Sequence, residues 1–311
     1  MNVWLEWLCL AACRRSWRVY QHLSFAATKV VGSSSVRIPI RSGMGLSNIP
    51  NLQVSQPELT HAVKECARRG YQGCFVDIGA NTGQSLLAFL AANVPGSYLG
   101  FEPDIEAAAY VAELLRRNPV IEGQILATAL GASAGCTVMH TAARGYVGAT
   151  INPAMTPHTM YHRLSRVTRA TGDSHLAHLP RDGILLIKID VEGAELAVLQ
   201  GLKETLRLTG APLYVEVLGV DHFLDGSYSR EYFGEIGKEE LAQIVRARRS
   251  NAGLVEEFLK ECGYDLFMIT EAALTSIQRI DVDEPRPGYQ GERNVLALAR
   301  KRVVSMKGAR S

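Results

Sequence analysis

The ten residues Cys74–Gly83 constrain the fold of this chain more than any other stretch. They begin with an apolar run typical of a strand buried on both faces, and they break at Gly79 and Gly83 before apolar residues return at helical spacing. A strand, a glycine turn and a helix make up the first unit of a doubly wound α/β fold, in which ligands bind beyond the carboxyl ends of the strands. The sequence therefore predicts a binding site directly after Ile78.

An acidic residue, Glu102, ends the next predicted strand, Ser97–Phe101. It follows Asp77 by 102 − 77 = 25 residues, which is the length of one crossover from strand to strand. A carboxylate in this place can accept hydrogen bonds from both hydroxyls of a ribose. The sequence thus predicts a cofactor that contains a nucleoside.

The spacing of glycines in the turn decides between classes of such cofactors. A dinucleotide fingerprint needs glycines at relative positions 1, 3 and 6, where this chain has Gly79, Asn81 and Gln84. No Gly-x-x-x-x-Gly-Lys-Ser/Thr stretch occurs, which argues against a P-loop. The pattern present is Asp-x-Gly-x-x-x-Gly, formed by Asp77, Gly79 and Gly83, and it resembles motif I of class I S-adenosylmethionine-dependent methyltransferases.

Further stretches downstream sharpen this resemblance. In chain order, the matching stretches are Val76–Gly83, Phe101–Pro103, Ile187–Glu195 and Val215–Val217. Together they resemble the FkbM family of methyltransferases, and the Lys-Ile-Asp-Val-Glu-Gly-x-Glu stretch that begins at Lys188 is the most specific of them. The likeness covers residues 70–300 and is weaker between Ala132 and Arg181.

The resemblance implies a class I methyltransferase-like (Rossmann-like) α/β fold, a doubly wound sheet of seven strands. In that fold, Tyr264–Ile269 and Asn294–Leu298 form the closing antiparallel hairpin of the sheet. The chain then divides into an N-terminal helical extension and linker, residues 1–55, and an FkbM-like methyltransferase domain, residues 56–311. Within this domain, we expect Ala132–Arg181 to form a small excursion of strands and a lid on the substrate side.

The resemblance also implies S-adenosylmethionine as the cofactor. The residues expected to bind it are Asp77, Gly79, Asn81, Gly83, Glu102 and Pro103. Of these, Glu102 would bind the ribose hydroxyls, and Asp77 would hold the turn and the amine side of the methionine. The glycines and the asparagine would shape the turn against the cofactor.

Two acidic residues after the fourth predicted strand of the sheet, the apolar run Ile184–Ile189, are the candidate catalytic residues; they are Asp190 and Glu192. Methyl transfer to a hydroxyl requires a base for the departing proton, and a nearby carboxylate is suited to this. Asp190 is the candidate base or acceptor anchor, and its alternative role is to cap a helix that begins near Gly193. Acidic residues at a helix start also favour the macrodipole, which offers a purely structural role for Glu192.

Other polar residues of the same region allow more than one interpretation. Glu216, in the fifth predicted strand, Leu213–Val217, can point into the cleft or toward Lys188, and Lys188 can pair with an acid in the sheet. His158 and His162 are spaced i, i+4, as zinc ligands on a helix would be. No His-Glu-x-x-His pattern accompanies them, so we expect loop or surface histidines and no metal site.

The first 55 residues lie outside the resemblance. Residues 1–20 can form a helix with Trp4 and Trp7 on one side, but its apolar part is too short to cross a membrane, and Glu6 argues against a signal peptide. Such a helix would contact the core, a partner or, with arginines behind the tryptophans, a membrane surface. Gly32–Asn51, rich in glycine, serine and proline, is expected to be a linker or irregular arm.

The net charge and the cysteine content limit which binding partners and which cellular compartment we expect for this protein. The net charge is +2, and no large basic patch predicts a nucleic-acid surface. The short basic cluster of Arg246, Arg248 and Arg249 is typical of a solvated helix face. The six cysteines include no Cys-x-x-Cys pair, which suits a reducing, cytoplasmic compartment.

These features favour an S-adenosylmethionine-dependent O-methyltransferase that acts on a hydroxyl of a small molecule, sugar or glycan. Two functions of other classes are the alternatives. A nucleotide-binding oxidoreductase could use the same scaffold, although the failed dinucleotide pattern weighs against it. A non-catalytic binding protein could retain the fold and use residues 1–50 as its contact element.

Overall fold

The computed structural model of the chain describes nine segments. They are residues 24–41, 44–45, 48, 56–119, 121–142, 149–224, 235–270, 273–284 and 292–300. The helix predicted within residues 1–20 lies outside these segments, so that prediction stays open.

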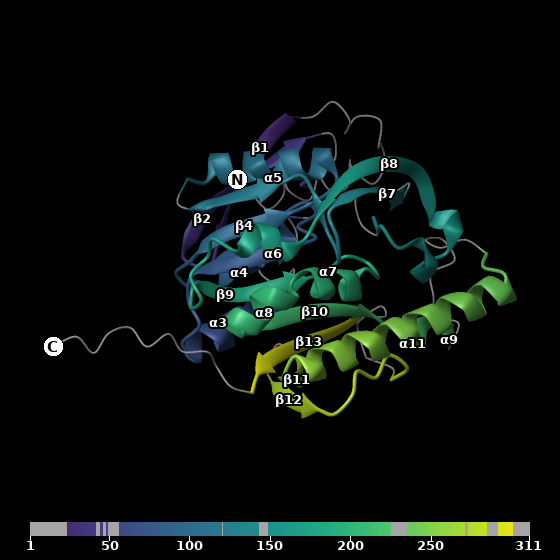
Figure 1. Cartoon of the computed structure of the whole chain (residues 1–311). Helices are drawn as coiled ribbons and strands as arrows, with labels where there is room; N and C mark the ends of the chain where they lie inside the picture. Colours follow the sequence, from purple (N-terminus) through teal and green to yellow (C-terminus); the bar gives the residue numbers. More distant parts are fainter. Residues whose placement is uncertain are drawn as a thin grey trace.

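The described part of the chain is built around a mixed sheet of eight strands (Figure 1). In spatial order they are β12 (Leu274–Ile277), β11 (Tyr264–Ile269), β13 (Glu292–Ala299), β10 (Leu213–Leu218), β9 (Ile184–Ile189), β3 (Cys74–Ile78), β4 (Ser97–Phe101) and β5 (Gly123–Leu126). The strands from β10 to β5 are parallel, so their carboxyl ends meet at one edge. The predicted α/β architecture is confirmed, and it brings the ends of β3, β4 and β9 together.

The sheet differs from the prediction in its strand count. β12 adds an eighth strand at the edge beside β11, where the sequence implied seven. No residue of β12 is fully buried, and such an edge strand lacks the continuous apolar run that marked the central ones. β11 and β13 do pair antiparallel, as predicted, but β12 lies between them in the chain, so they are not a simple hairpin.

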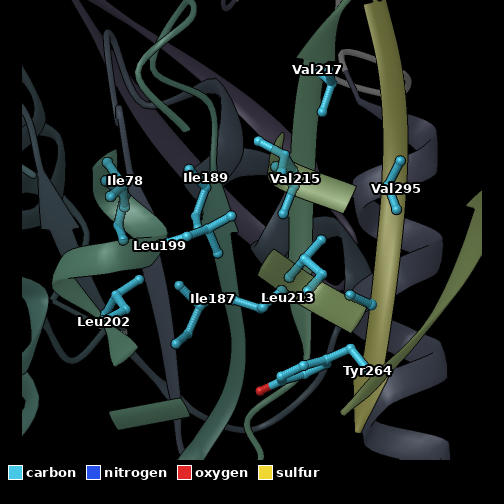
Figure 2. Packing of buried hydrophobic residues seen from close by; sticks show 14 of the residues in the cluster. Ile78, Ile187, Ile189, Leu199, Leu202, Leu213, Val215, Val217, Tyr264 and Val295 are labelled. Carbon is cyan, nitrogen blue, oxygen red and sulfur yellow. The ribbon is translucent and has the colours of Figure 1, made fainter. Parts of the chain in front are cut away.

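Helices cover both faces of this sheet. One face carries α3 (Pro57–Arg68), α4 (Gln84–Ala92) and α5 (Ile105–Arg117), and the other carries α7 (Glu195–Gly201), α8 (Lys203–Thr209) and α11 (Lys238–Glu261) (Figure 1). The two faces of the sheet enter two separate cores, so that Phe75 packs with the first set of helices and Ile78 with the second. Figure 2 shows the second core, in which Ile189 of β9 and Val215 of β10 gather with Leu199 of α7.

A β-hairpin precedes α3. β1 (Ser24–Val31) and β2 (Ser34–Arg41) pair antiparallel, and β2 lies against α5. Three alternate side chains of β2 are fully buried in the first core, namely Val36, Ile38 and Ile40. Apolar residues at every second position are typical of a strand with one buried face.

The hairpin corrects one expectation for the N-terminal region. The irregular arm predicted over Gly32–Asn51 is wrong for Ser34–Arg41, because these residues form the strand β2. Glycine, serine and proline in this region led to the linker prediction, whereas the alternation of three apolar residues determines the local structure.

Tyr110 of α5 holds the hairpin through its buried hydroxyl, which donates to the carbonyl oxygen of Pro39 at 2.8 Å. In Tyr110→Phe this carbonyl loses its donor, so we expect the free energy of unfolding to fall by about 1 kcal/mol. Denaturant titration of both proteins measures the change, with an unaltered slope as the sign that the folded structure is kept. Coincident midpoints would show that this hydrogen bond does not stabilise the hairpin.

The stretch Ala132–Arg181 contributes most of a small second sheet, as predicted. Its strands, in spatial order, are β6 (Ala129–Leu130), β8 (Tyr161–Ala170) and β7 (Gly135–Ala142). The turns η1 (Pro153–Met155) and η2 (His158–Met160) precede β8, and α6 (Gly172–Leu176) follows it. The chain from Gly123 to Leu130 is divided between the two sheets, because β5 joins the large sheet and β6 the small one.

α11 is the longest helix among the described residues and runs from Lys238 to Glu261. Its residue Arg248 is 4% exposed, so the prediction of a solvated basic face is wrong at this position. Within the described segments, no helix combines the length and apolar character needed to cross a membrane.

Candidate functional site

A cleft opens at the carboxyl ends of β3, β4 and β9, with about 630 Å³ of empty space, part of it open to solvent. Six of the eight predicted site residues line it: Gly79, Asn81, Glu102, Pro103, Asp190 and Glu192. The small sheet and the segments that precede β6 and follow β7 supply another wall, which includes Thr128, Leu130, Met139, Thr150 and Ile151. Asp77 and Gly83 lie behind the lining and support it.

The turn after β3 passes very close to the end of β9. Gly79 has a φ angle of +83°, and a Cβ atom on it would lie 1.8 Å from the carbonyl oxygen of Asp190. A side chain is therefore excluded there on both conformational and steric grounds. Gly83, with a φ angle of +81°, precedes the first residue of α4 and sets the entry into that helix.

Glu102 is held in the cleft by two backbone donors. The N–H of Asp104 donates to its Oε1 and the N–H of Asn81 to its Oε2, each at 2.8 Å. The side chain is 6% exposed. Burial raises the pKa of Glu102 to about 7, while the two backbone donors favour the charged form. The carboxylate is thus fixed in orientation before any ligand arrives.

Asn81 offers a further polar group in the cleft. Its φ angle is +46°, a conformation that asparagine adopts more readily than most residues. Its backbone N–H binds Glu102, whereas its side-chain oxygen Oδ1 is buried and accepts no hydrogen bond from the described part of the chain. A buried acceptor that lines a cleft in this way fits a ligand with a hydrogen-bond donor.

Lys188 joins β3 and β9 beneath the cleft. Its ammonium Nζ lies 3.3 Å from Oδ1 of Asp77 and 3.2 Å from Oδ2 of Asp190, and it donates to the carbonyl oxygen of Gly79 at 2.8 Å. Lys188 is 1% exposed and Asp77 is fully buried. The predicted pairing of Lys188 with an acid in the sheet is confirmed, and it involves both acids.

The charge on Lys188 depends on these neighbours. Burial opposes the charged form, but Asp190, Asp77 and Glu216 outweigh it and hold the pKa of Lys188 above its usual range. Of the two orientations left open for Glu216, this favours the one toward Lys188. Asp77 also accepts a hydrogen bond from the hydroxyl of Tyr98 at 2.8 Å. Its carboxylate therefore links Lys188 of β9 and Tyr98 of β4 to β3 below the turn.

The turn Asp190–Gly193 carries both candidate catalytic residues. Asp190 is 22% exposed and faces the cleft, and Glu192 has a φ angle of +55°. α7 begins only at Glu195 and its N-cap is Ala194, so Asp190 does not cap this helix. The alternative of a capping role for Asp190 is therefore wrong, and its polar partner is Lys188.

Residues of the small-sheet segment hold the same turn from the other side. The hydroxyl of Thr150 donates to the carbonyl oxygen of Glu192 at 2.8 Å, and Nδ2 of Asn152 donates to that of Gly193 at 2.7 Å. Sequence analysis missed both residues, because they lie where the family resemblance is weak and nothing in their spacing marks a site.

The histidines of the excursion have separate surroundings. Nδ1 of His158 lies 2.5 Å from Oε1 of Glu240, the ring of His140 packs against Tyr161, and that of His175 packs against Phe101. Among the described residues, no three His, Cys, Asp or Glu side chains converge as metal ligands would.

Comparison with known proteins gives one family. The model of the family described as "Methyltransferase FkbM domain" matches residues 77–266, which include every predicted site residue. No curated protein matches the sequence.

Three solved structures resemble the chain at low identity. The methyltransferase FkbM of Methylobacillus flagellatus shares 13% identity over 83% of this chain and 54% of its own length, with a TM-score of 0.39. The plantazolicin methyltransferase BpumL, in complex with SAH and a triazolic desmethylPZN analog, shares 13% identity over 79% of this chain and 87% of its own length, with a TM-score of 0.41. The SAH-bound methyltransferase PaMTH1 of Podospora anserina shares 10% identity over 79% of this chain and 88% of its own length, with a TM-score of 0.40. The chain thus spans about half the length of the first of these proteins.

Proposed function

Because the chain belongs to the methyltransferase FkbM domain family, we propose that it transfers a methyl group from S-adenosylmethionine to a hydroxyl on a small molecule, sugar or glycan. The main support for S-adenosylmethionine as the cofactor is the geometry of Glu102. Its two oxygens are oriented by backbone N–H groups at 2.8 Å, and each keeps capacity for a second donor. Two neighbouring hydroxyls of a ribose supply such donors.

The remaining lining fits the rest of the cofactor. Gly79 lines the cleft, and because it has no side chain the backbone of Asp190 can pack directly against the turn after β3. The buried oxygen of Asn81, which lacks a donor from the described residues, fits a polar group of the ligand. Ile78, Phe101 and Leu130 give the cleft apolar walls, as a flat aromatic base requires.

When bound, S-adenosylmethionine supplies an activated methyl group on a sulfonium. The protein must then hold the acceptor in line, exclude water and remove the acceptor's proton. We assign the proton to the carboxylate of Asp190, which faces the cleft and is oriented by the ammonium of Lys188 at 3.2 Å. Glu192, on the same turn, would anchor the acceptor through a hydrogen bond.

The two alternative functions have less support. A dinucleotide oxidoreductase lacks the required glycines in the turn after β3, and the family match is to a methyltransferase domain. A binding protein without catalysis would not need two acidic side chains on the cleft beside an oriented Glu102. The cytoplasmic location and the nature of the acceptor stay predictions.

Calorimetric titration of the purified chain with S-adenosylmethionine, S-adenosylhomocysteine and NAD tests the proposal. We expect saturable binding of the first two at one site and no heat from NAD, because the turn does not suit a dinucleotide. Absence of binding by folded protein, checked by circular dichroism, would overturn the proposed cofactor. Binding of NAD alone would instead support the oxidoreductase.

A further inference from the structure

Two polar residues are buried on one side of α11. Arg248 is 4% and Asn251 is 7% exposed, and their spacing of three residues places them on the same face of the helix. Figure 1 shows α11 on the side of the sheet that carries α7, and its N-terminal half contacts η1. Buried polar groups that are not paired would destabilise this core, so their partners explain their position.

Arg248 binds two segments, η1 and the residue that follows β10. Its Nε donates to the carbonyl oxygen of Met155 and its Nη1 to that of Gly219, both at 2.7 Å. The guanidinium also lies 4.8 Å from the ring centre of Phe223. The forked donor geometry of arginine suits this arrangement, because the rigid guanidinium directs separate N–H groups at the two carbonyls, whereas a lysine ammonium has no such fork.

Met155 transmits this contact to the turn Asp190–Gly193. A Cβ atom on Gly193 would lie 2.5 Å from Cγ of Met155, so the methionine side chain fills the space above this glycine. Gly193 also has a φ angle of +101°, which only glycine adopts readily. The position of Met155 therefore limits how the turn can move.

Asn251 reaches the same glycine by a second route. Its Nδ2 donates to Oε2 of Glu195 at 2.9 Å, and Oε1 of Glu195 accepts from the N–H of Gly193 at 2.8 Å. Glu195 is fully buried. Burial raises the pKa of Glu195, while the hydrogen bonds from Gly193 and Asn251 favour its charged form.

We propose that Arg248 and Asn251 are positioning residues, through which α11 fixes the turn Asp190–Gly193 from two directions and so sets the place of Asp190 and Glu192 in the cleft. That the position of Asp190 and Glu192 matters for catalysis rests on the proposed function. That α11 holds the turn Asp190–Gly193 in place does not, because it concerns contacts within the chain. Sequence analysis had interpreted this part of α11 as a solvated basic face.

Hydrogen exchange followed by mass spectrometry tests the proposal without cofactor or acceptor. In Arg248→Met and in Asn251→Leu, we expect amides of residues 190–195 to exchange at least about tenfold faster than in the wild type. Amides of β4, across the sheet, should change less than about twofold. Arg248→Lys should restore part of the protection, since it keeps a positively charged donor group but lacks the guanidinium fork. Arg246→Met, an exposed position on the same helix, is the matched control and should match the wild type.

The outcomes separate positioning from general stabilisation. Equal acceleration in β4 and in the turn would show that the two residues only stabilise the whole fold, and unchanged exchange in the turn would also overturn the proposal. If Arg248→Met does not fold, Arg248→Lys and Asn251→Leu give the same comparison. Failure of S-adenosylmethionine to bind in calorimetry would sink the proposed function and leave this result untouched.

Discussion

Replacing Lys188 with methionine is expected to lower the free energy of unfolding by about 3–5 kcal/mol. The ammonium is 1% exposed and lies within 3.3 Å of the carboxylates of Asp77 and Asp190. Methionine has a similar volume and no charge, so Asp77 would remain fully buried without its cation. Removing one partner of a buried pair leaves an uncompensated charge, and this dominates the loss. Urea or guanidinium titration measures the change.

Two further variants give this prediction its controls. Lys203→Met makes the same chemical change at an exposed position of α8, and should alter the free energy of unfolding by less than about 0.5 kcal/mol. Asp77→Asn combined with Lys188→Met removes the stranded carboxylate, so the double variant should lose less stability than the sum of the single ones. If Lys188→Met were as stable as Lys203→Met, the ion pairs would not hold the ends of β3 and β9 together.

The parts of the site that the sequence predicted are those defined by short-range signals. The glycine turn, Glu102 and the pair Asp190 and Glu192 each follow directly after an apolar run, and a strand end fixes where such residues lie. Parallel strands then bring these ends to one edge whatever the intervening chain does. Six of the eight predicted residues consequently line one cleft.

The residues that were missed depend on contacts between distant parts of the chain. Arg248 binds Met155 across 93 residues, and Asn251 binds Glu195 across 56, so no local pattern could pair them. On α11 these side chains occupy positions where charged or polar residues are usually solvated. The capping role considered for Asp190 failed for a similar reason, because its partner is the ammonium of Lys188 and α7 starts five residues later.

The hairpin and β12 show a different limit of prediction. β2 has a clear alternation of Val36, Ile38 and Ile40, yet its neighbours favour loops, and the competing signals could not be ranked without knowledge of α5. β12 is a short edge strand with no fully buried residue, so only its pairing with β11 identifies it. In both cases packing against another element decides the structure.

Replacing Glu102 with alanine is expected to weaken binding of S-adenosylmethionine at least about 100-fold, since two hydrogen bonds to a charged group would be lost at about 1.5–3 kcal/mol each. Calorimetry measures this, with Glu122→Ala, an exposed acid before β5, as the matched control. The free energy of unfolding should fall less than the free energy of binding, because among the described residues Glu102 accepts hydrogen bonds from two backbone N–H groups, those of Asn81 and Asp104. Tight binding by Glu102→Ala would contradict the ribose role.

The raised pKa of Glu102 makes the stability of the folded chain depend on pH. Its pKa is about 7 in the folded chain against 4.5 for an ordinary glutamate, and burial is the main cause. The folded state therefore keeps a proton between pH 4.5 and 7 that the unfolded state has lost, so the contribution of Glu102 to stability decreases as pH rises through that window and is constant above it.

Binding of the cofactor should show the opposite trend. The ribose hydroxyls donate to the carboxylate, so the ionised form is the one that binds, and affinity should rise about tenfold from pH 6 to pH 8. Calorimetry at pH 6 in buffers of different ionisation enthalpy should detect release of close to one proton for each cofactor bound. An affinity that is flat over this range, with no proton released, would show that Glu102 is already ionised in the free protein or does not contact the ribose. Glu102→Ala distinguishes these two cases, because only the first leaves its 100-fold loss in place.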